Sequence, residues 1–71
     1  MARRHWRQFE RRKAAVTLRS GASVIGVLWE ATPEFLTLRE ASMTVEGAGD
    51  VPADGIMVLP REHVEFLQVL G

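Results

Sequence analysis

Two apolar segments close this chain with only a tight turn between them. The first runs from Ile56 to Leu59 and ends at Pro60, and the second begins at Val64 and continues to Val69. Proline has no amide hydrogen to donate to a ladder, so it marks the end of a strand, and a tight turn brings the second segment back beside the first. The C-terminus is therefore predicted to be a pair of short strands, which favours a small β-rich fold.

The size of the chain limits the core that it can build. With 71 residues it can bury one small core, whose stability is marginal unless disulfides, a metal or self-association add to it. There is no cysteine, which excludes disulfides and thiolate metal sites, and two histidines are too few to predict a structural zinc. Association with further copies of the chain remains as the expected source of stability.

No segment of the sequence predicts insertion into a membrane. The apolar stretches fall short of the roughly 18 residues that a spanning helix needs. The arginine-rich N-terminus also lacks the apolar run of a signal peptide. We expect the protein to be intracellular, or to be part of an assembly that forms inside a cell.

A formal net charge of zero conceals a strong asymmetry along the chain. Residues 1–13 hold six basic side chains and one acidic side chain, a formal charge of +5. The remainder holds three arginines and eight acidic residues, a formal charge of −5. Such a separation is typical of a basic arm that meets nucleic acid, an acidic membrane or an acidic protein surface. A neighbouring copy of the chain could also be the acidic partner.

Residues 1–14 are predicted to form a basic amphipathic helix. Between Ala2 and Ala14 there is no glycine, proline or valine, and Trp6 and Phe9 are three residues apart, so both are expected to pack on the rest of the domain. Another face of the helix carries the arginines Arg4, Arg7 and Arg11. That face is either merely solvated or a contact surface, and we weigh the two interpretations equally.

Three further strands are expected between the helix and the closing pair. Residues 15–19 alternate, residues 23–31 are apolar on both faces, and residues 35–46 follow an interruption by proline. Gly26 lies in the middle of the second of these strands, where a strand can bend or another backbone can approach. A polar hairpin loop is predicted over residues 47–55.

The strand predicted over residues 35–46 changes its apolar face midway. Leu36 and Leu38 are at even positions, whereas Ala41 and Met43 are at odd ones. Because side chains alternate across a strand, this swap requires a bulge or a sharp bend, expected near Arg39-Glu40. The last strand repeats the behaviour. Such bends allow one sheet to fold back into a small barrel.

These elements predict a single all-β domain. The expected order is a short N-terminal α-helix followed by five strands with short connections, and there is no internal repeat. This order predicts a small, five-stranded, strongly bent antiparallel barrel of the SH3 type over residues 15–71.

The sequence carries no recognisable arrangement of catalytic residues. No nucleophile motif of the Gly-x-Ser-x-Gly type occurs, and the two histidines, His5 and His63, stand in unrelated contexts. The protein is predicted not to be an enzyme and to need no metal or cofactor. Trp6, Trp29 and Phe35 could stack on bases, but Glu30 and Glu34 are the sequence neighbours of Trp29 and Phe35, which disfavours a nucleic-acid site on the barrel.

The pattern resembles that of the Sm-like family, ring-forming proteins that include the eukaryotic Sm proteins and the bacterial Hfq type. The resemblance covers residues 2–70. It rests on the helix and on the segments Val16-Thr17-Leu18-Arg19-Ser20-Gly21, Val24-Ile25-Gly26-Val27-Leu28, Phe35-Leu36-Thr37-Leu38-Arg39-Glu40-Ala41 and Leu59-Pro60-Arg61-Glu62-His63-Val64. It implies an Sm-like barrel whose fourth strand pairs with the fifth strand of the next copy, in a ring of roughly five to seven copies.

The last two strands are too apolar to remain free edges, which agrees with such a ring. The residues expected at the interface between copies are Ile56, Val58, Val64, Phe66, Leu67 and Val69.

Two loops depart from the pattern of RNA-binding members of the family. Members that bind uridine-rich RNA usually carry an Asp and an Asn after the second strand, where this chain has Thr32-Pro33-Glu34. They also carry an Arg-Gly pair in the last turn, where the matching positions are Pro60-Arg61, and the Lys-His signature of the Hfq type is not matched. The resemblance therefore implies the fold and the ring, but not the usual uridine pocket.

The chain is also similar to short Sm-like proteins encoded among the structural genes of tailed phages that infect actinobacteria. This narrower resemblance rests on the Arg/Trp-rich helix and on Val58-Leu59-Pro60-Arg61-Glu62-His63-Val64. It implies a virion component, such as a minor capsid, decoration or portal-associated protein. The residues that would dock it on an acidic capsid or portal surface are Arg3, Arg4, Trp6, Arg7 and Arg11.

Two hypotheses of function follow from the sequence. In the first, the protein is a non-enzymatic, ring-forming structural or assembly protein of a phage particle. In the second, it is an Sm-like RNA-binding module that uses Arg4, Arg7 and Arg11 in place of the missing pocket. The acidic barrel and the missing uridine-binding residues favour the first hypothesis.

Overall fold

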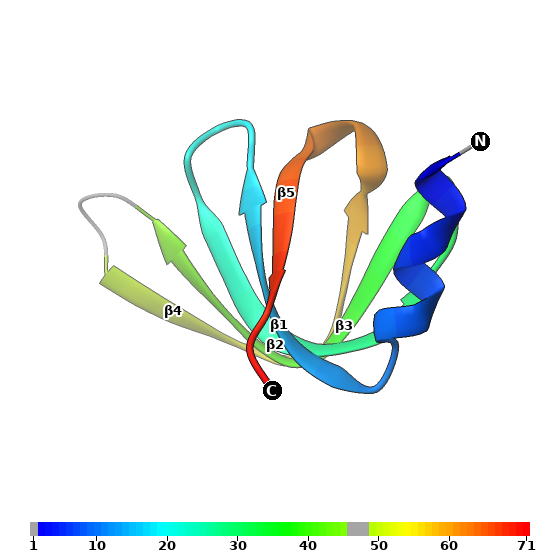
Figure 1. Ribbon diagram of the computed structural model, residues 1–71. Helices are drawn as coiled ribbons and strands as arrows, with labels where there is room; N and C mark the ends of the chain where they lie inside the picture. Colours follow the sequence, from blue (N-terminus) through cyan, green and yellow to red (C-terminus); the bar gives the residue numbers. More distant parts are fainter. Residues whose placement is uncertain (1, 46–48) are drawn as a thin grey trace.

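The computed structural model describes the backbone of residues 2–45 and 49–71 and the side chains of residues 6–44 and 55–71. The elements, in chain order, are the 3-10 helix η1 (Ala2–Phe9), β1 (Arg12–Leu18), β2 (Ser23–Ala31), β3 (Phe35–Val45), β4 (Gly49–Pro60), the 3-10 helix η2 (Arg61–His63) and β5 (Val64–Val69). The strands form one antiparallel sheet in the order β4-β3-β2-β1-β5. Figure 1 shows this sheet strongly bent, with η1 lying beside it. The predicted five-stranded, bent, antiparallel all-β fold is confirmed.

The bend in β3 lies where the swap of apolar faces predicted it. The β3–β4 register shifts between Arg39 and Ala41, and the intervening Glu40 has a φ of 52°, a left-handed conformation that is uncommon outside glycine. Leu36 and Leu38 before the shift are buried, and Ala41 after it is buried as well. The bulge therefore keeps the apolar side chains of both halves of β3 on the inside.

Gly26 allows β2 and β3 to approach each other closely at the same level of the sheet. A Cβ atom at this position would lie 2.9 Å from the carbonyl oxygen of Arg39 and 3.0 Å from the Cα of Ala41. Both contacts are shorter than van der Waals distance, and both are to backbone atoms that cannot rotate away. Only glycine fits here without moving one strand away from the other.

The core is small and apolar. Its members come from all five strands: Ala14, Val16, Val24, Leu28, Ala31, Leu36, Leu38, Ala41, Leu59 and Val64. Trp6 and Phe9 of η1 pack against this core while remaining partly exposed, as the sequence predicted. No polar or charged residue is buried within the described part of the chain.

The helix differs in type and in length from the prediction of an α-helix over residues 1–14. It is a 3-10 helix that ends at Phe9, and the amide of Glu10 donates to the carbonyl of Arg7 three residues earlier, as in 3-10 geometry. Side chains three apart are superposed in such a helix, so both aromatic rings lie over the barrel. Within residues 2–45 and 49–71, no helix is long and apolar enough to cross a membrane.

The predicted loop over residues 47–55 is largely strand. β4 begins at Gly49 and pairs with β3 from that residue onward, while residues 46–48 lie outside the described part. Backbone pairing needs no apolar side chains, which is why a polar segment can form a ladder with the long β3. Pro52 is compatible with this pairing because β4 is an edge strand of the sheet.

Because β2 and β3 approach closely at Gly26, the stability of the fold should be sensitive to any side chain introduced at this position. Gly26→Ala should lower the free energy of unfolding by about 1–3 kcal/mol, because the new methyl group collides with β3 backbone atoms. Chemical denaturation followed by circular dichroism measures this. Gly71→Ala, at a glycine with open space around its Cβ position, is the control and should leave stability unchanged. Equal stability of both variants would contradict the steric argument.

Candidate functional site

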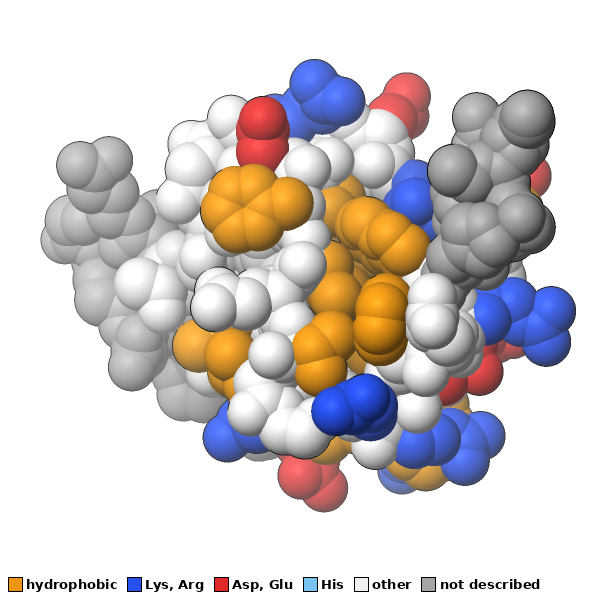
Figure 2. All heavy atoms as spheres, viewed as in Figure 1, with side chains coloured by type: hydrophobic (Ala, Val, Ile, Leu, Met, Phe, Trp, Pro, Cys, Tyr) orange, Lys and Arg blue, Asp and Glu red, His pale blue; other side chains and the backbone are white. Residues whose placement is uncertain are grey.

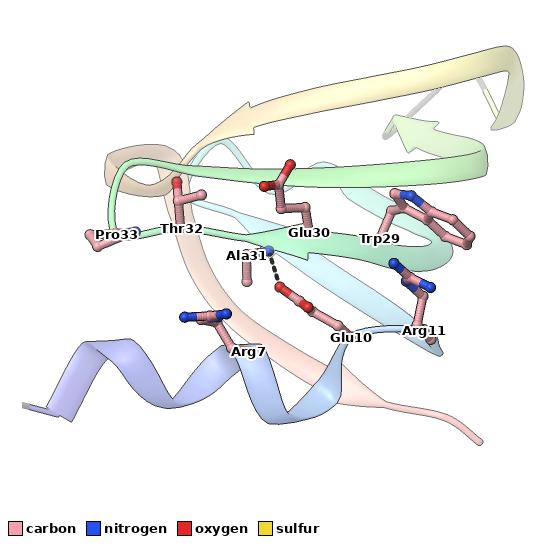
Figure 3. Close-up of a pocket in the computed structure, with 8 residues that line it drawn as sticks. All are labelled: Arg7, Glu10, Arg11, Trp29, Glu30, Ala31, Thr32 and Pro33. Carbon is pink, nitrogen blue, oxygen red and sulfur yellow. Dashed lines mark hydrogen bonds between the residues drawn. The ribbon is translucent and has the colours of Figure 1, made fainter.

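A groove of about 580 Å³ runs between η1 and the end of β2 (Figure 3). We call it the arginine groove, and its lining consists of Arg7, Glu10, Arg11, Trp29, Glu30, Ala31, Thr32 and Pro33. Figure 3 shows the side chain of Arg7 extending from η1 and that of Arg11 extending from the turn after η1 toward Trp29 of β2. The groove thus lies between the basic arm of the chain and the barrel.

Two hydrogen bonds fix the segment after η1 against β2. Glu10 Oε2 accepts the amide N–H of Ala31 at 2.9 Å, and the amide of Arg11 donates to the carbonyl of Leu28 at 2.6 Å. Arg11 has a φ of 72°, which turns the chain from the helix into β1. These contacts explain why the helix stops before residue 14, since Arg11 already belongs to the turn.

Two guanidinium groups stack on the indole ring of Trp29. The guanidinium carbon of Arg11 lies 4.1 Å from the ring centroid, and that of Arg39 lies 4.3 Å from it. Arg39 pairs with Val27 in the β2–β3 ladder, so it is the diagonal neighbour of Trp29 on the outer face of the sheet. Each such contact contributes about 0.5–1 kcal/mol at an exposed site. The turn after η1 and strand β3 therefore each place a positive charge beside the ring of Trp29.

Two carboxylates, those of Glu10 and Glu30, also line the groove. Glu10 is engaged with the backbone amide of Ala31, and Figure 3 shows the side chain of Glu30 pointing away from η1. Of the acidic neighbours expected around the aromatic residues, Glu30 lines the same groove as Trp29, while Arg11 and Arg39 are the side chains that stack on its ring. The sequence did not predict Arg39 as a partner of Trp29, because that contact depends on the register of β3 on β2.

The predicted docking residues of the N-terminal arm do not form one face. Arg7 and Arg11 line the arginine groove, but Arg11 belongs to the turn after η1. Trp6 instead lies under the guanidinium of Arg61, whose central carbon is 3.9 Å from its ring centroid. The side chains of Arg3 and Arg4 are outside the described part of the structure. The structure therefore brings Arg7 and Arg11 together with Trp29 and not with Trp6.

The predicted interface residues lie on the two edge strands. In the described part of the sheet β4 pairs only with β3, and β5 pairs only with β1. Ile56, Val58 and Phe66 are 62%, 53% and 52% exposed, whereas Leu67 and Val69 are half-buried. Hydrophobic side chains gather in the middle of the face shown in Figure 2.

Val64 does not belong with these exposed residues, because its side chain is part of the core. The register of β1 on β5 shifts between Leu18, paired with Val64, and Thr17, paired with Phe66. This bulge turns Phe66 outward although both residues occupy even positions. The interface prediction is therefore corrected at Val64.

The donor groups for a metal are not gathered in the described residues. Among them, no group of three or more His, Cys, Asp or Glu side chains is placed to hold an ion. The chemistry that the groove offers is instead electrostatic and aromatic, with guanidinium groups around one indole ring. Such a combination attracts phosphate and can present a platform for bases.

Neither a protein-family model nor a curated protein matches this sequence, but solved structures do resemble the chain. A heptameric archaeal Sm protein superposes with a TM-score of 0.78 at 23% identity, covering 90% of this chain and 93% of that one. The chain has the Sm-like fold. A second Sm-like protein, the SmAP1 heptamer of P. aerophilum, gives a TM-score of 0.77 at 23% identity over 90% of this chain and 85% of that one.

A chain of the NatC complex bound to CoA is also similar in fold, with a TM-score of 0.76 at 19% identity over 87% of this chain and 79% of that one. These identities show a shared fold alone. None of the three similar structures is a phage protein, so the narrower resemblance to phage proteins has no support from them.

Because Glu10 accepts the amide of Ala31, removing its carboxylate should reduce stability more than removing that of Glu30, which also lines the arginine groove. Glu10→Ala should lower the free energy of unfolding by about 1–3 kcal/mol, because it leaves the Ala31 amide without its acceptor. Glu10→Gln keeps an oxygen at that place and should retain most of the stability. Glu30→Ala, which removes an exposed carboxylate, should change it by less than about 0.5 kcal/mol. Denaturant titration distinguishes the variants, and equal losses of stability at Glu10 and Glu30 would contradict a role for the bond.

Proposed function

We propose that this protein is a ring-forming Sm-like module that binds single-stranded RNA in its arginine groove. The single observation that carries the proposal is the stacking of Arg11 and Arg39 on Trp29, at 4.1 and 4.3 Å. Arg7, across the groove on η1, adds a third cation. Arginines attract phosphates, and bases stack on guanidinium planes as they do on aromatic rings, so a cluster of this kind has the parts of a single-strand site.

The arginine groove replaces the usual pocket in this proposal. The loop residues that bind uridine in Sm-like RNA-binding proteins are absent at 32–34 and 60–61. Arg11 and Arg39 come from distant parts of the sequence, the basic arm and β3, and converge on one ring. The site contains part of what the second hypothesis predicted, since Arg7 and Arg11 belong to it and Arg39 is added.

Self-association is part of the same proposal. Each edge strand, β4 and β5, carries apolar side chains that are more than half exposed, such as Val58 and Phe66. A free apolar edge is an aggregation hazard, and pairing β4 of one copy with β5 of the next removes both edges in a closed ring. Two of the structures with this fold are heptamers, which supports a ring for this chain as well.

A structural role in a phage particle is the rival hypothesis. The same arginines could meet an acidic capsid or portal surface, since a guanidinium pairs with carboxylate and phosphate alike. The planar guanidiniums held on the ring favour RNA, because bases stack on guanidinium planes and carboxylates do not. We therefore rank the RNA-binding module first.

The first test of the proposal is the binding of a fluorescently labelled uridine-rich oligonucleotide, measured by anisotropy at several salt concentrations. Replacing Arg7 and Arg11 by glutamine should weaken binding about tenfold or more, and the salt slope should fall by roughly 0.7 to 1 for each phosphate that is no longer bound. Arg39→Gln should act in the same direction.

Arg19→Gln is the matched control for this test, because it removes an arginine whose Nε donates to the carbonyl of Glu62, outside the groove. The control should bind RNA as the unchanged protein does. An equal weakening in the control, or binding that ignores salt, would contradict the arginine groove as the RNA site. A protein that binds an acidic protein surface and no RNA would instead favour the structural hypothesis.

If the protein forms a ring through β4 and β5, a charged substitution on either edge strand should reduce the mass of the assembly. Val58→Glu or Phe66→Glu places a charge in the proposed interface, so native mass spectrometry should find smaller species, mainly monomers. Phe35→Glu is the control, since Phe35 is 48% exposed but lies on β3, an inner strand whose two edges are already paired. A ring that survives both edge substitutions, or a monomeric unchanged protein, would rule out this interface.

A further inference from the structure

A second, smaller pocket lies between the loop that follows β2 and the turn that follows β4. It has a volume of about 340 Å³, and its lining consists of Pro33, Glu34, Phe35, Pro60, Arg61 and Glu62. We call it the loop pocket. It shares only Pro33 with the arginine groove, and it contains neither Trp29 nor the arginines that stack on it.

The two walls of the loop pocket are tied together. The amide of Arg61 donates to the carbonyl of Glu34 at 2.8 Å, and Arg61 Nη1 donates to the carbonyl of Thr32 at 3.2 Å. Thr32 Oγ1 accepts the amides of Glu34 and Phe35 at 3.2 and 3.0 Å, which fixes the first loop. A pocket held in this way is formed before a ligand arrives, so binding costs little conformational entropy.

The surface of the loop pocket combines an apolar part with two carboxylates. Phe35 is 48% exposed and, with the two prolines, provides the apolar part. Glu34 and Glu62 are exposed, and in the described structure neither carboxylate has a hydrogen bond or an ion pair. The guanidinium of Arg61 stacks on Trp6 at 3.9 Å, on the η1 side. The pocket therefore presents more negative than positive charge to a ligand.

This chemistry excludes some ligands and favours one class. Two unpaired carboxylates repel the phosphates of a nucleic acid and would lose their hydration against a purely apolar ligand. Lysine and arginine side chains meet both requirements, because their aliphatic stems cover apolar surface while their charged ends remain beside carboxylates. A cation over the ring of Phe35 adds a further attraction.

We propose that the loop pocket binds a lysine- or arginine-rich segment of a partner protein. The stems of the basic side chains pack on Phe35, Pro33 and Pro60, and their charged ends pair with Glu34 and Glu62. The complementarity of charge selects this occupant over RNA, which the arginine groove attracts. The site does not depend on the RNA-binding proposal, because Phe35, Glu34 and Glu62 are not part of the arginine groove, with which the pocket shares only Pro33.

The test uses the full chain and a fluorescein-labelled lysine oligomer, with binding measured by anisotropy at low and at physiological salt. Glu34→Gln together with Glu62→Gln should weaken binding about tenfold or more. Glu30→Gln together with Glu65→Gln removes the same charge from exposed positions outside the loop pocket and should change affinity less than about twofold. Phe35→Ala should weaken binding while leaving the carboxylates in place.

Three results would overturn the inference. They are the absence of binding by the unchanged protein, an equal weakening in both double variants, and displacement of the lysine oligomer by a uridine oligomer whose own affinity changes with Glu34 and Glu62. The first two remove a specific basic-peptide site, and the third makes the loop pocket a nucleic-acid site. RNA binding that disappears only in the variants of Arg7, Arg11 and Arg39 has no bearing on the loop pocket, so the two proposals can fail separately.

Discussion

The close approach of β2 to β3 at Gly26 is the constraint on which the rest of the structure depends. A side chain there would meet the backbone of Arg39 and Ala41 at 2.9–3.0 Å, so only glycine lets the strands meet. The register shifts between Ile25 and Val27 in the β2–β3 ladder and between Arg39 and Ala41 in the β3–β4 ladder. These irregularities increase the local bend, which allows a sheet of five strands to enclose a core in so short a chain.

The same bend builds the candidate RNA site. It sets Arg39 opposite Val27 and therefore diagonally beside Trp29, on the outer face of the sheet. The turn at Arg11 then brings one arginine of the basic arm to the same indole ring, with its guanidinium carbon 4.1 Å from the centroid. The arm of +5 charge is thus not independent of the barrel, because one of its arginines and one barrel arginine share a single aromatic ring. Arg11 and Arg39 are far apart in the sequence, and only the fold brings them to the same ring.

The loop pocket and the arginine groove meet at Pro33 and carry opposite chemistry. Arg7 and Arg11 line the groove beside Glu10 and Glu30, with Arg39 added at Trp29, whereas Glu34 and Glu62 line the pocket beside Arg61. The contact between Trp6 and Arg61 joins η1 to the turn after β4, so the helix that forms one wall of the groove also rests on a residue of the pocket. A module with these two surfaces could hold RNA and a basic protein segment side by side, while its edge strands join it to further copies. In these proposals charge separates the two ligands, and the apolar side chains of the edge strands are left for assembly.

The sequence alone determined the elements that depend on local pattern. Alternation and apolar runs predicted five strands, although the first half of β4 was expected to be a loop. The swap from Leu38 to Ala41 predicted the bulge, the proline and the residues after it predicted the turn before β5, and Trp6 and Phe9 were expected on the core. It did not determine which arginines converge, where the helix ends, or that Val64 points inward and Phe66 outward. The direction of a strand side chain depends on register, and a one-residue bulge reverses it for every later residue of the strand. The end of the helix depends on the left-handed conformation of Arg11, which no rule based on residue type requires. Tertiary structure decided them because Arg11, Trp29 and Arg39 are far apart along the chain, and only packing of the whole sheet sets their positions.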